Sequence, residues 1–190
     1  MRASSLMLLA SAVLVTACGG KPPAEQPAPE PTPAPAPAPA PAPVDDSAER
    51  ERLEHERVAR EAAERAKALS AEVATMINFE FDKADIRQAD QGTLDRKAAI
   101  MGANPGLRVR ISGHADERGS DEYNLALGNR RAGAAKRYLE GKGVDGSRVD
   151  VISYGEERPL EQGSTEEAYA ANRRDEFEIT GGGDNLKAPQ

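Results

Sequence analysis

The 190-residue sequence has a single cysteine, no tryptophan and only 4% aromatic residues. One cysteine excludes an internal disulfide framework and any zinc or iron–sulfur site built from several cysteines. Basic residues are also outnumbered, with 25 Lys and Arg against 32 Asp and Glu, for a formal net charge of −7. Because general nucleic-acid binders need a net basic footprint, we expect no nucleic-acid partner. The length allows one ordinary domain and some additional chain.

Long apolar runs are also missing. The run at residues 6–15 is shorter than the ~20 residues that a membrane-spanning helix needs, and it is typical of a secretory signal peptide. The residues Val15-Thr16-Ala17-Cys18 that follow resemble a bacterial lipobox. We therefore expect a signal peptide over residues 1–17, lipidation of Cys18, and a protein anchored by lipid to the periplasmic face of the outer membrane. The alternative is an ordinary signal peptide and a buried free cysteine.

Two spacers are expected next. Eleven of the 14 prolines lie in residues 22–43, so residues 18–44 form a lipidated N-terminus and a Pro-Ala linker that favours the extended polyproline II conformation. Residues 45–76 contain no Gly or Pro and carry dense charge of both signs, which predicts a helix. Its apolar stripe is thin, so we expect a solvated spacer helix and no long coiled coil; the stripe contains Leu53, Ala62 or Ala63, Leu69 and Val73.

Residues 77–180 have the patterns of one folded domain, and residues 181–190 are expected to form a flexible polar tail. Alternating apolar and polar residues predict strands, and apolar residues at helical spacing predict helices between them. The expected strands are 77–81, 107–111, 149–154 and 176–179, and the expected helices are 84–103, 120–143 and a short one after 164. The order β-α-β-α-β-α-β predicts an α/β (α+β sandwich) domain with helices packed on a mixed sheet.

The second helix and the loop before it hold the candidate binding residues. Asn124, Leu127 and Arg131 share one edge of this helix, about 100° from the core face, which we assign to Leu125, Gly128, Ala132, Ala135 and Leu139. The preceding loop contains Asp116. An acid and a guanidinium facing one cleft suit a zwitterionic ligand, with Asp116 taking an ammonium and Arg131 a carboxylate. The alternative is a structural Asp116–Arg131 salt bridge.

Five motifs along this domain resemble the OmpA-like C-terminal domain family: INFEFDKAD (77–85), GHADERGS (113–120), EYNLALGNRRA (122–132), ISYG (152–155) and NRR (172–174). They occur in order, with compatible spacing, over nearly all of residues 77–180. The resemblance implies a sheet with helices on one face and non-covalent binding of peptidoglycan at the meso-diaminopimelate of its stem peptide. It also implies a tether between outer membrane and cell wall, a periplasmic partner, TolB, and a role in cell division.

The same resemblance assigns site residues by position. Asp116 and Arg131 match the family's ligand-binding residues. The residues that match the lining of the same cleft are Asp82, Asn124, Leu127 and Arg173. No cofactor and no metal are implied. From the sequence, alanine at either Asp116 or Arg131 should abolish binding to sacculi and leave the fold intact.

An enzyme is the first alternative class. His114, Asp116 and Ser120 could be combined into a hydrolase or metal site, but a single histidine offers no ligand set, and no glycine-flanked serine elbow or HExxH motif is present. We therefore predict no enzymatic activity and expect His114 to hydrogen-bond the loop backbone. The second alternative is a motor anchor like the flagellar stator proteins, which use the same domain and carry a transmembrane helix.

Asp175 departs from the family pattern. It follows the NRR motif, where an apolar strand residue is more usual. A carboxylate buried at this position would cost stability. We therefore expect the last strand to lie at an edge of the sheet there.

Overall fold

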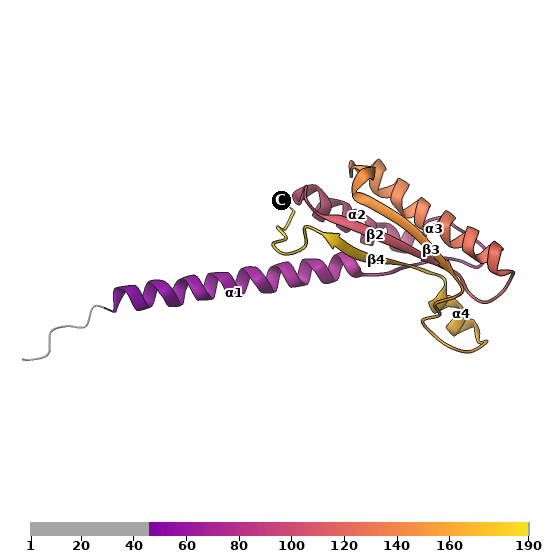
Figure 1. The fold of residues 1–190 in the computed structure, drawn as a ribbon, viewed down its shortest axis with the longest axis horizontal. Coiled ribbons are helices and arrows are strands. Elements are labelled where there is room, and N and C mark those ends of the chain that lie inside the picture. The colour runs from indigo at the N-terminus through magenta and orange to yellow at the C-terminus, as the bar shows by residue number, and fades with distance from the viewer. Residues whose placement is uncertain (1–45, 190) are drawn as a thin grey trace, which may run out of the picture. The chain divides into compact units, whose positions relative to one another are not determined.

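Four strands and four α-helices make up the part of the chain that the computed structural model describes, residues 46–189 (Figure 1). The predicted signal peptide, Cys18 and the Pro-Ala linker lie outside the described residues. The elements are α1 (Ser47–Ala74), β1 (Ile77–Asn78), α2 (Gln88–Ala103), β2 (Arg108–His114), α3 (Asp121–Gly141), the 3-10 turn Gly146–Arg148, β3 (Val149–Gly155), α4 (Glu166–Asn172) and β4 (Arg174–Gly181). The predicted order of the domain is confirmed.

The strands form one mixed sheet in the order β1-β4-β2-β3. β2 and β3 are parallel, whereas β4 runs antiparallel to both β1 and β2. The parallel pair is connected through α3, as a crossover requires. Apolar residues of the sheet such as Ile111 and Phe177, which pair across β2 and β4, form one core with residues of α2 and α3.

The helix starts follow from local sequence. Ser120 caps α3 by accepting a hydrogen bond from the backbone N–H of Tyr123, and Thr165 caps α4 by accepting one from Ala168. Hydroxyl side chains satisfy the free N–H groups of a first helical turn in this way. The predicted core face of α3 is largely confirmed, with Gly128, Ala132, Ala135 and Leu139 buried. Leu125 is the exception, because its side chain is 48% exposed.

Gly128 of α3 and Gly113 of β2 let the helix lie directly against the sheet. A Cβ on Gly128 would overlap Ser153 Oγ and lie 2.8 Å from the carbonyl oxygen of Gly113. Gly128→Ala is therefore expected to lower the free energy of unfolding by about 2 kcal/mol, because the helix must shift away from β2 and β3. Chemical denaturation measures the change in the free energy of unfolding. Gly133→Ala is the matched control in the same helix, since its Cβ meets only the flexible end of Arg137 at 3.3 Å; it should keep or slightly raise stability. Equal stability of the two variants would contradict the close packing.

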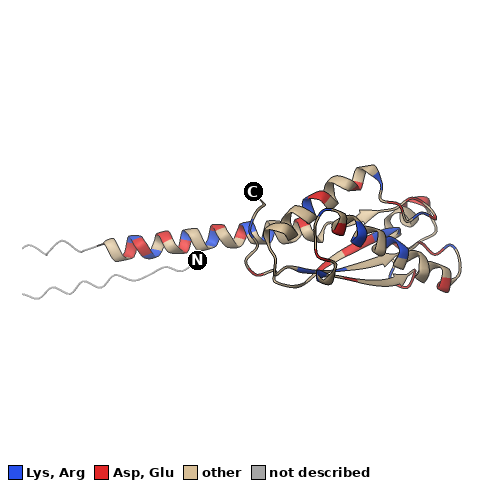
Figure 2. Cartoon of the chain, turned by 90° about the horizontal axis from the view of Figure 1, so that it is seen from above, with Lys and Arg blue, Asp and Glu red and all other residues tan. Residues whose placement is uncertain are grey.

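The helix α1 is solvated only over its first part. Charges of both signs cover it (Figure 2), and Arg57 pairs with Glu54 and Glu61 at 2.5 Å each. Its last turns differ from the predicted spacer, because Leu69 and Val73 belong to the core. The predicted boundary at residue 76 therefore does not separate the helix from the domain.

Lys97 of α2 holds the end of α1. Its buried ammonium donates to the carbonyl oxygens of Glu72, Val73 and Thr75 at 3.1, 2.5 and 2.6 Å, and it lies 4.1 Å from the ring centre of Phe177. A cation at the carbonyl end of a helix is favourable, because those carbonyl groups lack partners within the helix. The attachment of α1 therefore depends on a residue 22 or more positions away in the sequence.

The residues after β4 differ from the expected flexible tail. Leu186 is only 6% exposed and belongs to the core. The side chain of Asn104 exchanges two hydrogen bonds of 2.8 Å with the backbone N–H and carbonyl of Lys187. These two hydrogen bonds fix the backbone of the tail at Lys187, because the Asn104 amide satisfies both its N–H and its carbonyl group.

The prediction that β4 is an edge strand at Asp175 is wrong. β4 lies between β1 and β2, and Asp175 pairs with Ile77 on one side and Gly113 on the other. Its side chain is fully buried, and neither carboxyl oxygen has a hydrogen-bond partner among the described residues. β1 occupies the edge, so the domain accommodates a buried acid at this point.

Candidate functional site

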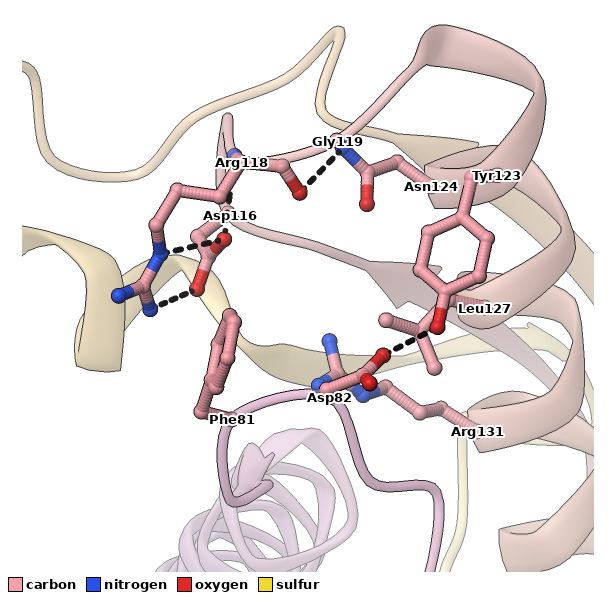
Figure 3. A pocket seen from close by; sticks show the side chains of 9 residues that line it. All are labelled: Phe81, Asp82, Asp116, Arg118, Gly119, Tyr123, Asn124, Leu127 and Arg131. Atoms are coloured by element: carbon pink, nitrogen blue, oxygen red, sulfur yellow. Dashed lines mark hydrogen bonds and ion pairs between the residues drawn. The ribbon is translucent and has the colours of Figure 1, made fainter.

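A pocket opens between the loop after β1, the loop after β2 and one side of α3 (Figure 3). The first loop contributes two residues, the second three, and the helix four. The lining residues are Phe81, Asp82, Asp116, Arg118, Gly119, Tyr123, Asn124, Leu127 and Arg131. Segments separated by up to about 50 positions thus meet at one cleft, because α3 packs on β2 and Arg131 of α3 bonds the backbone of the loop after β1.

Arg131 forms the floor of the pocket. Its side chain is fully buried, and its guanidinium donates to three backbone carbonyls, those of Lys83 and His114 at 2.8 Å and of Glu80 at 3.1 Å. Burial lowers the pKa of Arg131 to about 10, so it remains charged at neutral pH. A guanidinium has five N–H donors, so three are occupied and two remain for a ligand. The rigid placement favours recognition of a carboxylate.

Asp116 does not pair with Arg131. Its carboxylate, 4% exposed, accepts hydrogen bonds from Arg118, at 2.6 Å for the shortest, and from Arg173 at 3.0 Å. Burial acts to raise the pKa of Asp116, but these guanidinium bonds outweigh it and hold the pKa below its usual value. The alternative of a structural Asp116–Arg131 salt bridge is therefore wrong for the described residues, and the acid is neutralised by two other arginines.

Arg118 covers Asp116 from the solvent side. Its guanidinium lies between two aromatic rings, 4.1 Å from the centre of Phe81 and 4.3 Å from that of Tyr169. The neighbouring Glu117 fastens the loop to α4 by accepting hydrogen bonds from Ser164 at 2.7 Å and Tyr169 at 2.8 Å. These contacts fix the loop, and with it the position of Asp116.

Asp82 presents the exposed acid of the pocket. Its backbone φ of 55° lies in the left-handed region, which is unusual for a residue with a Cβ. Such strain is found where neighbouring contacts hold a residue in place, often at binding sites. Its carboxylate accepts a hydrogen bond from the Tyr123 hydroxyl across the mouth of the pocket (Figure 3). On the inner wall, the Asn124 amide donates to the backbone carbonyl of Arg118 at 3.3 Å and to Glu156.

The structure brings the predicted residues together. The five that line the pocket are Asp82, Asp116, Asn124, Leu127 and Arg131, while Arg173 lies behind it on Asp116. Sequence reasoning missed Phe81, Arg118, Gly119 and Tyr123. All four lie within the motifs that resemble the OmpA-like family, but their spacing along the chain does not mark them as residues that line a pocket.

The expected role of His114 is wrong. Its backbone carbonyl accepts from Arg131, but neither ring nitrogen has a hydrogen-bond partner in residues 46–189. Burial lowers the pKa of His114 to about 4, so the ring is neutral at physiological pH. It stacks obliquely near Tyr154, with ring centres 5.5 Å apart.

Within the described part of the chain, no three His, Cys, Asp or Glu side chains gather as a metal site would require. No helix among residues 46–189 is long and apolar enough to span a membrane.

The pocket combines two carboxylates with the guanidinium groups of Arg118 and Arg131, and Arg173 pairs with Asp116. This charge arrangement suits a ligand that carries both a carboxylate and an ammonium.

Comparison with known proteins identifies a family. The OmpA family profile matches residues 78–173. A peptidoglycan-associated lipoprotein of Haemophilus influenzae is 50% identical over 98 residues, which cover 52% of this chain and 64% of that protein. Another, of Mesorhizobium japonicum, is 41% identical over 118 residues, covering 62% of this chain and 70% of that protein. The chain thus spans less than two thirds of the length of the Haemophilus protein.

Solved structures agree with this assignment. The crystal structure of the peptidoglycan-associated lipoprotein from Burkholderia pseudomallei superposes with a TM-score of 0.55 at 35% identity, covering 55% of this chain and 89% of that one. The C-terminal domain of Helicobacter pylori MotB has a TM-score of 0.50 at 22% identity, over 56% and 84% of the two chains, and shares the fold alone. The chain belongs to the OmpA family, and the Haemophilus and Mesorhizobium relatives are peptidoglycan-associated lipoproteins.

Proposed function

We propose that this chain binds peptidoglycan non-covalently through the pocket at Arg131 and tethers the outer membrane to the cell wall. The carrying observation is the pocket itself, in which a rigid buried guanidinium and an exposed carboxylate face one cleft. The names of the relatives support the same conclusion, since they are called peptidoglycan-associated. The ligand we assign is meso-diaminopimelate of the stem peptide, whose free end carries both an ammonium and a carboxylate.

Each ligand group has a partner in this proposal. The carboxylate meets the two free N–H donors of Arg131, and Leu127 covers the aliphatic stem. The ammonium meets Asp82 first, because that carboxylate is exposed and its partner is Tyr123. Asp116 becomes available only when the ligand displaces Arg118, whose side chain is 33% exposed. Asp116 then serves mainly to position the arginines around it.

The proposed tether also requires an anchor at the N-terminal part of the chain. Lipidation of Cys18 would hold the N-terminus in the outer membrane, and stable anchoring is expected because more than one acyl chain is attached. TolB and the Tol-Pal system, acting in envelope integrity and cell division, are the partners we propose. The support for them is the likeness to peptidoglycan-associated lipoproteins.

Binding of the full chain to purified sacculi tests the function. Diaminopimelate-type sacculi should retain the protein at least tenfold better than lysine-type sacculi, because lysine lacks the carboxylate and would leave the Arg131 donors without a partner. Co-sedimentation at matched protein concentrations measures the difference. Equal retention would contradict diaminopimelate recognition, and no retention would contradict peptidoglycan binding. Release of soluble muropeptides would favour an enzyme.

A matched pair of variants tests the assignment of the ammonium. Asp82→Asn should weaken retention on diaminopimelate-type sacculi about tenfold, because the ligand loses its exposed counter-charge. Asp85→Asn, three residues away in the same loop and also exposed, removes the same charge outside the pocket and should bind like the wild type. Equal loss in both variants would indicate a general charge effect.

A further inference from the structure

A second hollow lies between α3 and β3, on the side of the helix away from the pocket at Arg131. Four α3 residues at helical spacing, Glu122, Leu125, Ala126 and Asn129, form one wall. Val151, Ile152 and Ser153 of β3 form the other. The residues of the first pocket, such as Asn124 and Leu127, project from a different side of the same helix. We call this hollow the α3–β3 groove.

The groove runs along an edge of the sheet. β3 is the last strand in the order β1-β4-β2-β3, and no strand within residues 46–189 pairs with its outer side (Figure 1). Unpaired N–H and C=O groups at such an edge can accept a further strand. Two apolar side chains are exposed beside it, Leu125 at 48% and Ile152 at 38%. The backbone edge and the apolar wall therefore lie together.

One end of the groove is acidic. The adjoining hollow is lined by Asp121, Glu122, Glu156 and Glu157 together with Leu125 and Tyr154. None of these four carboxylates takes part in an ion pair within residues 46–189. The guanidinium of Arg158 stacks at 3.6 Å on the ring of Tyr154, which lines this hollow. Clustered carboxylates without counter-ions favour a basic group on a binding partner.

We propose that the α3–β3 groove binds an extended basic segment of a partner protein, which adds to β3 as a further strand. Main-chain hydrogen bonds to the β3 edge supply affinity, and alternate side chains supply specificity. An apolar side chain of the segment packs on Leu125, and a Lys or Arg meets the acidic end. Recognition of this kind is independent of the peptidoglycan pocket.

Charge and composition select this occupant over two others. A second copy of the chain would present its own β3, Val149–Gly155, which contains no Lys or Arg to meet the acidic end. Residues 22–43 of the chain contain eleven prolines, which lack the N–H groups needed for strand pairing, and their charged residues are Glu25 and Glu30. A basic segment from another protein satisfies both the free backbone edge and the acidic end.

Hydrogen exchange on the full chain tests the proposal with defined probes. The first probe is a nine-residue peptide of alternating valine and lysine with blocked ends. The second is the same peptide N-methylated at every second residue, which removes the N–H groups along one edge. The third replaces lysine with glutamate. The first peptide should slow exchange of the amides at residues 150–154 at least tenfold, while the other two should leave them unchanged.

Two variants locate the binding. Leu125→Glu should weaken binding of the valine–lysine peptide at least tenfold, because it removes the apolar contact from the groove. Val58→Glu is the matched control, since Val58 is a similarly exposed apolar residue, at 52%, on α1; it should leave binding unchanged. Four results would each overturn the proposal. They are no binding of the first peptide at 1 mM, equal binding of the N-methylated peptide, protection mapped to other strands, and a dimer of the full chain that Leu125→Glu dissociates.

Discussion

Replacing Arg131 with alanine is expected to abolish retention on diaminopimelate-type sacculi and to lower the free energy of unfolding by about 4 kcal/mol. Two effects combine. The ligand's carboxylate loses its guanidinium, and the carbonyls of Glu80, Lys83 and His114 lose the donor that satisfies them in the folded state. Buried acceptors without a donor carry a desolvation penalty. Sacculus co-sedimentation and chemical denaturation measure the two losses separately.

Arg131→Lys separates binding from folding. Lysine retains the positive charge and can still reach one or two carbonyls, so the variant should fold with a smaller loss of stability. It lacks the planar fork that bonds a carboxylate through two parallel N–H groups, so retention on sacculi should still fall at least tenfold. A stably folded Arg131→Lys protein that binds like the wild type would remove Arg131 from the ligand site. Asp150→Asn, at an exposed position on β3, serves as the control for both measurements.

Replacing Asp175 with valine is expected to stabilise the protein by about 3 kcal/mol at pH 7. The wild-type carboxyl is fully buried, and both of its oxygens lack hydrogen-bond partners in the described structure. Valine fills similar space next to Ile77 and removes the polar group. Thermal and chemical denaturation would detect the change. A loss of stability would show that Asp175 makes a favourable contribution to the folded state.

The gain should depend on pH in a defined direction. An unfolded aspartate titrates near 3.9, whereas burial raises the pKa of folded Asp175 well above its usual value, against the smaller opposing effect of Arg131. Between these two values the folded protein keeps a proton that the unfolded chain has released, so the free energy of unfolding falls as pH rises. The advantage of Asp175→Val should be about 1 kcal/mol near pH 4 and grow toward neutral pH. Asp175→Asn, which cannot ionise, should show the same pH trend with a smaller gain. An advantage that does not change with pH would contradict the raised pKa.

Local patterns were sufficient for the order of the elements in the domain, although β1 (Ile77–Asn78) is shorter than the expected strand 77–81 and α2 begins at Gln88 instead of residue 84. The alternation around Ile111 predicted β2, and the helices expected from residue 120 and after residue 164 begin where Ser120 and Thr165 cap α3 and α4. These features depend on neighbours within a few residues, so the amino-acid order alone determines them. The helical spacing of Asn124, Leu127 and Arg131 likewise placed three side chains on one side of α3, and the pocket confirms that they lie together.

Tertiary structure decided which partner each charged side chain has. Asp116 could have paired with Arg131, but it pairs with Arg118 and Arg173. Arg131 instead donates to carbonyls in the loop after β1 and at the end of β2. Lys97 caps a helix that ends far from it in the sequence.

Tertiary structure also decided which side chains are buried and which are exposed. Asp175 is buried because β1 pairs outside β4, and Leu125 is exposed because the sheet ends at β3. Strand order brings together residues from distant parts of the chain, and no periodicity within one segment specifies that order. The sequence by itself therefore determined the order of the helices and strands and five of the nine residues that line the cleft, whereas strand order and long-range packing decided their charge partners and their exposure.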